Sequence, residues 1–273
     1  MQLRKGPSLI NKYIMPSIGL GVYRSPKGQI TFDTVSTAIN AGYRHIDTAS
    51  VYGNEKDVGE AIKDSFVPRS EIFITTKLWN GEQGYDSTLY AFEKSINLLD
   101  VDYIDLYLIH FPVPKLRLES WKAMEELFKE GRIKAIGVSN FLPHHIQELI
   151  DNCNIPPMVN QIEAHPFQTQ LPTRKICSDY GIVVSAYSPL VKAQKMNHPV
   201  LVQIAKQVGK TVAQVLIRWS IQNKMVPLPK SNTPSRILEN SQVFDFLLSE
   251  EQIEQLNSLN QDLYTGWSPV GIP

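Results

Sequence analysis

Four residues that could transfer or orient a proton lie at, or just after, the ends of β-type runs: Asp47, Tyr52, Lys77 and His110. A lysine ammonium near a phenol stabilises the phenolate, so Lys77 should lower the pKa of Tyr52 below its ordinary value of about 10. An aspartate pairs naturally with that lysine, and a histidine beside the phenol can orient a substrate oxygen. Together these residues fit the donation of a proton to a developing alkoxide.

Each of the four residues also has a structural explanation when taken alone. Asp47 could cap the helix that follows it, Tyr52 could pack within a loop, and His110 could be a core histidine. Lys77 is harder to explain in this way, because a lysine at the end of a buried strand needs a partner. The joint position of the four residues favours the catalytic interpretation. No nucleophile with its own base and no metal-ligand spacing is evident, so we expect no bound metal.

A second candidate site is a group of cations and hydroxyls at the start of a predicted helix: Lys230, Ser231, Thr233 and Arg236. Two cations, two hydroxyls and the free N–H groups of a helix N-terminus suit a phosphate. The alternative is a solvated helix start that Thr233 caps, with Pro234 in the first turn. That alternative does not explain two cations where the helix dipole disfavours positive charge.

The elements that must position these residues are eight short runs rich in Val, Ile and Tyr, which we predict as strands buried on both faces: 17–23, 43–49, 72–78, 104–110, 135–139, 157–163, 182–188 and 225–228. Segments with helical spacing lie between them, such as the apolar stripe of Leu89, Phe92, Ile96 and Leu99. This alternation predicts an α/β fold, a (β/α)8 TIM barrel over residues 1–273 as one domain. We expect a β-hairpin before Ser17 at the barrel floor.

A doubly wound parallel sheet is the competing fold. A sheet of that kind that binds a dinucleotide should show G-x-G-x-x-G after its first strand, but Gly19 and Gly21 are followed by no third glycine at that spacing. The barrel is therefore favoured. In a parallel barrel the carboxyl ends of all strands meet at one mouth, where the polar residues that end the strands would come together.

Composition narrows the classes of protein and of partner. The 273 residues include 27 Lys and Arg and 27 Asp and Glu, so the net charge is zero and argues against nucleic acid or a membrane surface as a partner. The first residues lack the apolar stretch of a secretory signal, and no run approaches the roughly 18 apolar residues of a membrane helix. With only two cysteines, Cys153 and Cys177, we expect no disulfide and a cytoplasmic location. We also expect a monomer.

Three motifs give the chain a resemblance to the aldo-keto reductase family over nearly its whole length. Residues 42–49 (GYRHIDTA) with Glu55, residues 133–141 (IKAIGVSNF), and residues 228–231 (LPKS) with Arg236 resemble the three family signatures. The short loop after His110 and the short C-terminal tail resemble microbial and protozoan members, including diketogluconate reductases and prostaglandin F synthase-like enzymes. The resemblance implies an NADPH-dependent oxidoreductase that reduces aldehydes and ketones to alcohols.

The resemblance also implies residue roles. Tyr52 would be the proton donor, tuned by Asp47 and Lys77, and His110 would orient the carbonyl. The cofactor would contact Gly21, Val22, Tyr23, Asp47, Ser139, Asn140, Gln161, Tyr187, Ser188, Leu190, Lys230, Ser231, Asn232, Thr233, Arg236, Glu239 and Asn240. Within that set, Tyr187 would stack on the nicotinamide and Arg236 would bind the 2′-phosphate. The substrate pocket would be lined by Tyr23, Trp79, His110, Phe111 and Trp267.

The chain departs from the family pattern in the predicted cofactor loop. After 187–190 (YSPL), Val191 and Lys192 stand where the family often has Gly-Ser, and Lys192 could contact the pyrophosphate instead. Two function classes remain as alternatives, namely a nicotinamide-binding regulatory subunit and a barrel hydrolase or isomerase that uses no nicotinamide. Retention of all four proton-transfer residues argues against a regulatory subunit, which has no need to tune a proton donor.

Overall fold

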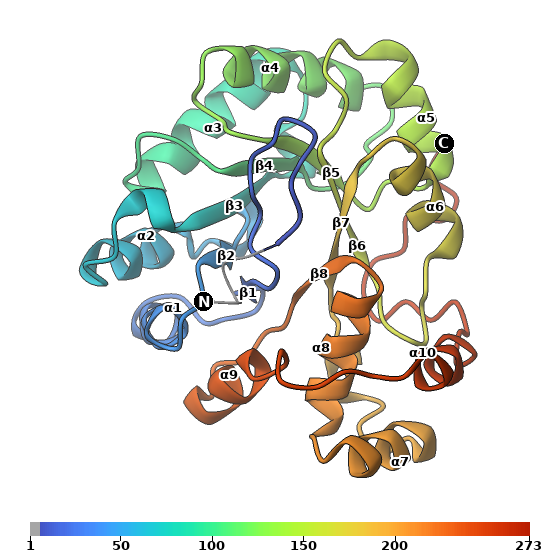
Figure 1. The fold of residues 1–273 in the computed structure, drawn as a ribbon. Helices are drawn as coiled ribbons and strands as arrows, with labels where there is room; N and C mark the ends of the chain where they lie inside the picture. Colours follow the sequence, from blue (N-terminus) through green and yellow to red (C-terminus); the bar gives the residue numbers. More distant parts are fainter. Residues whose placement is uncertain (1–5) are drawn as a thin grey trace.

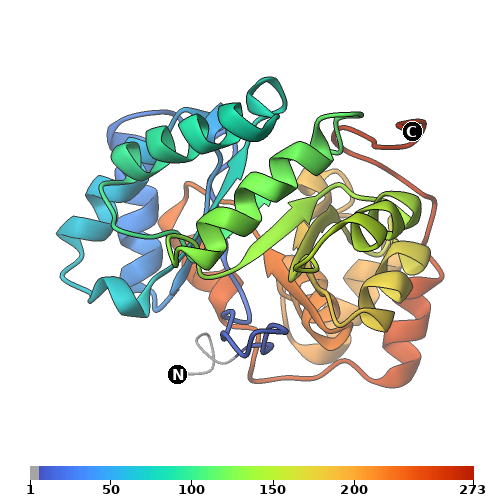
Figure 2. The same ribbon diagram turned by 90° about the horizontal axis from the view of Figure 1, so that it is seen from above.

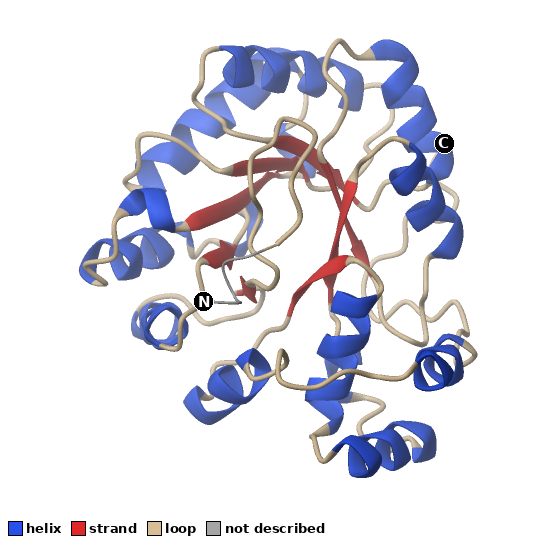
Figure 3. Ribbon diagram, in the orientation of Figure 1, coloured by secondary structure: helices blue, strands red, loops and turns tan. Residues whose placement is uncertain are grey.

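The computed structural model describes residues 6–273 of the chain. Eight parallel strands form one sheet in chain order, and helices surround it (Figures 1 and 3). The strands are β1 Leu20–Gly21, β2 His45–Asp47, β3 Phe73–Leu78, β4 Leu106–Ile109, β5 Ile136–Ser139, β6 Val159–Glu163, β7 Val183–Tyr187 and β8 Met225–Leu228. The predicted (β/α)8 barrel is thus confirmed, and each strand lies inside its predicted run.

All the strands except β8 are shorter than predicted, because regular pairing covers only part of each apolar run. β1 pairs with β2 at only two positions, Leu20 with Ile46 and Gly21 with Asp47. Ahead of β4, Ile104 forms only an isolated bridge with Ile133. The ends of the runs therefore belong to loops at the two rims of the barrel.

Ten α-helices among the described residues cover the outside of the sheet, as the view from above in Figure 2 shows. They are α1 Gln29–Asn40, α2 Glu55–Asp64, α3 Tyr85–Leu99, α4 Arg117–Lys129, α5 Pro143–Asn152, α6 Leu171–Asp179, α7 Pro199–Val208, α8 Val212–Gln222, α9 Pro234–Ser241 and α10 Glu250–Asn257. The predicted stripe on α3 is buried, with Phe92, Ile96 and Leu99 all in the core. No single helix in this part of the chain could span a membrane by length and hydropathy; α7 and α8 pass that test only together, bent by 87°.

The barrel closes where β8 meets β1. Two backbone hydrogen bonds join them among the described residues, from Gly19 N–H to the carbonyl of Pro227 (3.0 Å) and from Gly21 N–H to the carbonyl of Pro229 (3.1 Å). Both run in one direction, because a proline nitrogen carries no hydrogen to return. We call this junction the β8–β1 seam.

The predicted hairpin before Ser17 lies at the amino ends of the strands. Its arms pair antiparallel at Ser8 and Ile14, while the first five residues of the chain lie outside the described residues. The Tyr13 hydroxyl donates to Asp105 Oδ1 (2.6 Å), just ahead of β4, and the Tyr13 ring stacks on Phe73 at the start of β3. These contacts place the hairpin at the barrel floor, at the end opposite the predicted mouth.

Candidate active site

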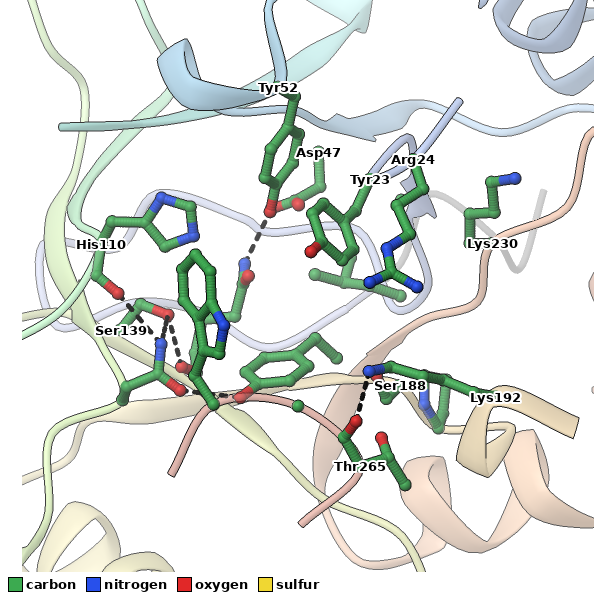
Figure 4. A pocket seen from close by; sticks show the side chains of 18 of the residues that line it. Tyr23, Arg24, Asp47, Tyr52, His110, Ser139, Ser188, Lys192, Lys230 and Thr265 are labelled. Atoms are coloured by element: carbon green, nitrogen blue, oxygen red, sulfur yellow. Dashed lines mark hydrogen bonds between the residues drawn. The ribbon is translucent and has the colours of Figure 1, made fainter. Parts of the chain in front are cut away.

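A cavity of about 520 Å³ opens at the carboxyl ends of the strands. It is lined by Gly21, Tyr23, Arg24, Asp47, Val51, Tyr52, His110, Ser139, Asn140, Gln161, Tyr187, Ser188, Pro189, Leu190, Lys192, Leu228, Lys230, Thr265, Gly266 and Trp267 (Figure 4). The structure thus brings together residues that are scattered between positions 21 and 267. Parallel pairing explains the convergence, because every strand delivers its last side chains to the same rim.

Lys77 forms a buried ion pair with Asp47 at the base of this cavity. The Lys77 ammonium donates to Asp47 Oδ1 (2.7 Å) and to the carbonyl of Thr48 (2.7 Å), and its side chain is fully buried. The other carboxylate oxygen of Asp47 accepts from Gln161 Nε2 (2.7 Å). Burial raises the pKa of Asp47 and lowers the pKa of Lys77, whereas their mutual attraction favours both charges. Asp47 is therefore engaged within the barrel rather than in capping a helix.

Tyr52 lies above this ion pair, with its ring 5.2 Å from the Lys77 ammonium. Burial raises the pKa of Tyr52 well above 10, and the neighbouring Asp47 carboxylate acts in the same direction. The expectation that Lys77 brings this pKa below 10 is therefore wrong. The sequence reveals the lysine but not the degree of burial of the phenol, and burial has the larger effect. Tyr52 is consequently a protonated phenol, the state that a proton donor must have.

His110 faces Tyr52 across the cavity, and the two rings lie edge to face at 5.7 Å between centroids (Figure 4). Burial lowers the pKa of His110 well below 6.5, and the positive charge of Lys77 adds to this shift. The imidazole is therefore neutral. Its Nδ1 has no hydrogen-bond partner among the residues described. Because His110 lines the cavity, the N–H of its neutral imidazole can donate one hydrogen bond to a ligand oxygen there.

A polar cluster lies beside these residues, where β5, β6 and β7 end. The Ser139 hydroxyl donates to the carbonyl of Gln161 (2.8 Å), and Asn140 Nδ2 donates to Ser139 Oγ (3.1 Å). The Tyr187 hydroxyl donates to Asn140 Oδ1 (2.8 Å). Asn140 has a positive φ of 64°, a conformation that asparagine tolerates better than most residues. These bonds fix an amide and a hydroxyl at the cavity wall.

Three cations line the other side of the cavity: Arg24, Lys192 and Lys230 (Figure 4). None of them forms an ion pair with a described acidic residue. Partial burial lowers the pKa of Lys230, as expected of a cation held partly out of water. Sequence reasoning missed Arg24, although its position just after β1 was a usable signal. Unpaired positive charge on one wall favours an anionic ligand.

The remaining predicted cofactor residues on and before α9 lie outside the lining of the cavity. Ser231, Asn232, Thr233 and Arg236, predicted near the phosphate, lie around the start of the helix, and Glu239 and Asn240, predicted near the adenine, lie in its last turn. Thr233 precedes the helix as expected, but its side chain makes no capping bond; Ser231 Oγ instead accepts from Thr233 N–H (3.1 Å). The Asn232 side chain accepts from Ser25, and Glu239 accepts from Thr211. Arg236 is exposed on the first turn.

The predicted substrate-contacting aromatics are distributed unevenly. Tyr23 and Trp267 line the cavity. Trp79 stands behind them, packing on Trp267 (5.4 Å between centroids) and on His110 (5.3 Å). Phe111 is absent from the lining, and so is the predicted cofactor residue Val22, which is fully buried and whose carbonyl accepts from Asn54. Within the described part of the chain no three His, Cys, Asp or Glu side chains group as metal ligands, and both cysteines are free.

Comparison with known proteins places this arrangement among related enzymes. The model of the Aldo/keto reductase family matches residues 17–261. The chain is 49% identical over 265 residues to a 9,11-endoperoxide prostaglandin H2 reductase of Trypanosoma cruzi, covering 96% of this chain and 94% of that protein. It is 48% identical over 267 residues to a glyoxal reductase of Bacillus subtilis, covering 98% and 97% of the two chains.

Solved structures give the same picture. An aldo-keto reductase enzyme from a Medee basin deep-sea metagenome library superposes with a TM-score of 0.95 at 45% identity, covering 98% of this chain and 100% of that chain. An aldo-keto reductase of Bombyx mori, solved in complex with NADP, superposes with a TM-score of 0.88 at 38% identity, covering 95% and 94%.

Proposed function

From the premise that this chain belongs to the aldo/keto reductase family, we infer that its cavity holds NADPH beside a carbonyl substrate and that Tyr52 protonates the substrate oxygen. The protein is an NADP-dependent oxidoreductase that acts on carbonyl groups. The single observation that carries the assignment of roles is the buried Lys77–Asp47 pair directly beneath a protonated tyrosine at the cavity wall. The family also removes the alternative of a hydrolase or isomerase that uses no nicotinamide.

The described residues fit a dinucleotide. Arg24, Lys192 and Lys230 offer unpaired positive charge for phosphates, with Arg236 close by on α9 for a 2′-phosphate. The amide and hydroxyl groups of Ser139, Asn140 and Gln161 suit a carboxamide at the other end of the cavity. Tyr187 offers an aromatic face between these groups. A Cβ on Gly21 would lie 3.3 Å from the Leu228 carbonyl, so a glycine lets these two strands approach closely at the cavity wall.

The residues act on the substrate oxygen in a defined order. His110, being neutral, donates a hydrogen bond that orients the carbonyl toward Tyr52. When bound, the cofactor supplies the hydride that reduces the carbonyl carbon. Tyr52 gives its proton to the oxygen as negative charge develops there. Lys77 stabilises the phenolate that remains, because its ammonium lies 5.2 Å from the phenol ring, and Asp47 holds that ammonium in place.

We extend the proposal to properties that follow from composition and from the family. The chain acts as one NADPH-binding domain over residues 1–273, as a monomer in the cytoplasm, with aldehydes and ketones as substrates and with no nucleic acid or membrane as partner. The rest of the predicted cofactor set, including Val22, Ser188, Leu190 and the α9 residues, and the predicted substrate residues Trp79 and Phe111, complete the proposed site.

Replacing Tyr52 with phenylalanine tests the assignment. Tyr52→Phe removes only the hydroxyl, so NADPH binding should stay within about twofold while turnover falls by roughly 10²–10⁴, the range of general acid catalysis. Fluorescence titration with NADPH and initial rates with an aldehyde measure the two effects. His110→Ala should raise the KM as well as lower the rate, because His110 also orients the carbonyl. Near-normal turnover in a folded Tyr52→Phe enzyme would remove the mechanism.

A further inference from the structure

The last part of the chain runs from α10 along one side of the barrel and ends near α5 (Figures 1 and 2). On the way it brings Trp267 to the cavity. We call residues 261–273 the C-terminal strap. At one end, the Gln261 and Leu263 N–H groups both donate to the carbonyl of Phe167 (3.0 Å each). At the other end, Arg117 donates to the Pro273 carbonyl (2.7 Å). Both anchors are several residues away from Trp267 along the chain. A contact closer to Trp267 must therefore fix the position of its indole.

Glu163, the last residue of β6, holds the strap immediately before Trp267. Glu163 is 1% exposed. Oε1 accepts from the Thr265 N–H (2.9 Å) and from the Thr265 hydroxyl, and Oε2 accepts from the Gly266 N–H (3.2 Å). His165 Nε2 lies 3.2 Å from Oε1. Burial raises the pKa of Glu163, but the hydrogen bonds of His165 and Thr265 outweigh it and lower the pKa overall, so the group is a carboxylate.

Lys192 binds the peptide unit between Thr265 and Gly266 together with Glu163. Its ammonium donates to the carbonyl of Thr265, while Glu163 accepts from the N–H of Gly266. Lys192 belongs to a turn in which Val191, Lys192 and Ala193 all have positive φ (52°, 48° and 62°). Left-handed φ is costly for a β-branched residue such as Val191 and persists only when surrounding contacts enforce it. The turn and the strap therefore form one fixed unit at the cavity rim.

Fixing residues 265 and 266 also fixes the aromatic wall that follows them. Trp267 packs on Trp79, and Trp79 packs on His110, the residue that orients the carbonyl. Glu163 itself touches neither the cavity centre nor His110 in any described contact. Its effect on the substrate must pass through the backbone of the strap and the indole of Trp267, which itself lines the cavity.

We propose that Glu163 is a positioning residue for substrate selection, setting Trp267 so that the site favours carbonyl compounds that carry an aromatic or other flat apolar group. This inference rests on the proposed function, because it requires the carbonyl to lie between Tyr52 and His110. An aromatic substituent gains stacking contact with a fixed indole, whereas a small dicarbonyl does not reach it. Glu163 should therefore affect the KM of aromatic aldehydes and leave that of small ones unchanged.

Glu163→Gln is the test, because it keeps the shape and removes one acceptor oxygen. A glutamine cannot accept from both Thr265 and Gly266, so one N–H of the strap faces an NH₂ group. Losing a hydrogen bond to a charged group should raise the KM for 4-nitrobenzaldehyde about tenfold. The kcat, the KM for methylglyoxal and the Kd for NADPH should stay within about twofold. An equal rise in KM for both aldehydes, or no rise for either, would overturn the proposal.

Glu125 provides a matched control on α4. It is 2% exposed, and its carboxylate accepts from the N–H groups of Asn154 (2.7 Å) and Ile155 (2.8 Å) and from the Asn154 side chain (2.9 Å). Glu125 makes no described contact with a residue that lines the cavity. Glu125→Gln should lose a similar amount of thermal stability and keep the wild-type ratio of the two KM values. A changed ratio in Glu125→Gln would mean that general loosening explains the effect, and would refute a positioning role.

Trp267→Ala keeps the proposal testable even when Glu163→Gln folds poorly. It should raise the KM for 4-nitrobenzaldehyde selectively, and adding Glu163→Gln should then change the ratio no further, because the residue being positioned is gone. If each substitution changed the ratio of the two KM values by its own factor, and the two factors multiplied in the double variant, the inference would be overturned. Failure of the proposed function itself would be seen elsewhere, as Tyr52→Phe enzyme that reduces both aldehydes at the wild-type rate.

Discussion

Removing Lys77 alone should destabilise the protein and abolish most of its activity. Lys77→Met leaves the buried Asp47 carboxylate with Gln161 as its one described hydrogen-bond donor. Breaking a buried ion pair by deleting one partner costs about 3–5 kcal/mol of unfolding free energy, because a charge remains in a medium of low polarity. The turnover should fall by at least the roughly 10²-fold of general acid catalysis, since the phenolate of Tyr52 loses its nearest cation.

The pH dependence of this deficit follows from Asp47. Burial already raises the pKa of Asp47, and loss of Lys77 removes the main opposing attraction. A carboxyl whose pKa is higher in the folded protein than in the unfolded chain, where it is about 3.9, stabilises the folded state fully below about pH 3.9. This contribution to the free energy of unfolding is lost as the pH rises toward the folded-state pKa. The deficit of Lys77→Met relative to wild type should therefore be largest near pH 7 and shrink toward pH 4, by up to about 1.4 kcal/mol per pH unit. Urea unfolding across this range measures it.

The double variant Asp47→Asn/Lys77→Met separates stability from catalysis. Without a buried charge it should be more stable at pH 7 than Lys77→Met, although its catalytic machinery is gone and its turnover stays low. Two results would refute the reasoning. One is a double variant whose loss of unfolding free energy equals the sum of the two single losses, and the other is a Lys77→Met deficit that does not change with pH.

Three further predictions concern the cofactor, the barrel interior and one strand contact. Arg236→Ala should weaken NADPH binding roughly 10- to 100-fold and leave NADH unchanged in fluorescence titrations, because only NADPH carries the 2′-phosphate; equal losses would contradict the assignment. Burial lowers the pKa of His45 to about 3, so the folded state stays unprotonated while the unfolded state binds a proton below about pH 6.5. Stability should fall by up to about 1.4 kcal/mol per pH unit as pH drops from 6.5 toward 3, and His45→Gln should remove this part of the slope in urea unfolding; an unchanged slope would count against it. A Cβ on Gly137 would lie 2.5 Å from the Val159 carbonyl, so Gly137→Ala should lower the free energy of unfolding in urea by about 1–3 kcal/mol. Gly81→Ala should lower it far less, because a Cβ there has no atom within 4 Å. Equal losses would show that the neighbouring strands move apart at little cost.

The barrel and the catalytic group could be predicted from the sequence because their signals are local. Apolar runs at an even spacing mark the strands, and Asp47, Lys77 and His110 each lie within the last three residues of such a run. Parallel order then places those ends at one rim without any knowledge of long-range contacts. The ends of the strands could be predicted less accurately. A strand stops where its pairing with a neighbour stops, which the apolar run itself does not show.

Features that depend on contacts between distant segments were missed. Nothing near Glu163 in the sequence indicates that it accepts bonds from Thr265 and Gly266, about a hundred residues further on. Likewise, the direction of the pKa shift of Tyr52 depends on how completely other segments bury the phenol. The contact of Lys192 with Thr265 depends on a strained turn that no propensity favours.

The β8–β1 seam gives ligand binding a second physical consequence. The first and last strands are joined there by hydrogen bonds that run in one direction, and Gly21, Leu228 and Lys230 on its two sides all line the cavity. A molecule that bridges both strands must leave before they can separate, so its occupancy adds to the free energy of local opening. At a ligand concentration of 100 times the Kd this linkage amounts to about 2.7 kcal/mol. Hydrogen exchange at the Gly19 and Gly21 amides would therefore slow as the cavity fills, and the free energy needed to open the barrel at this seam would rise with the concentration of the cofactor.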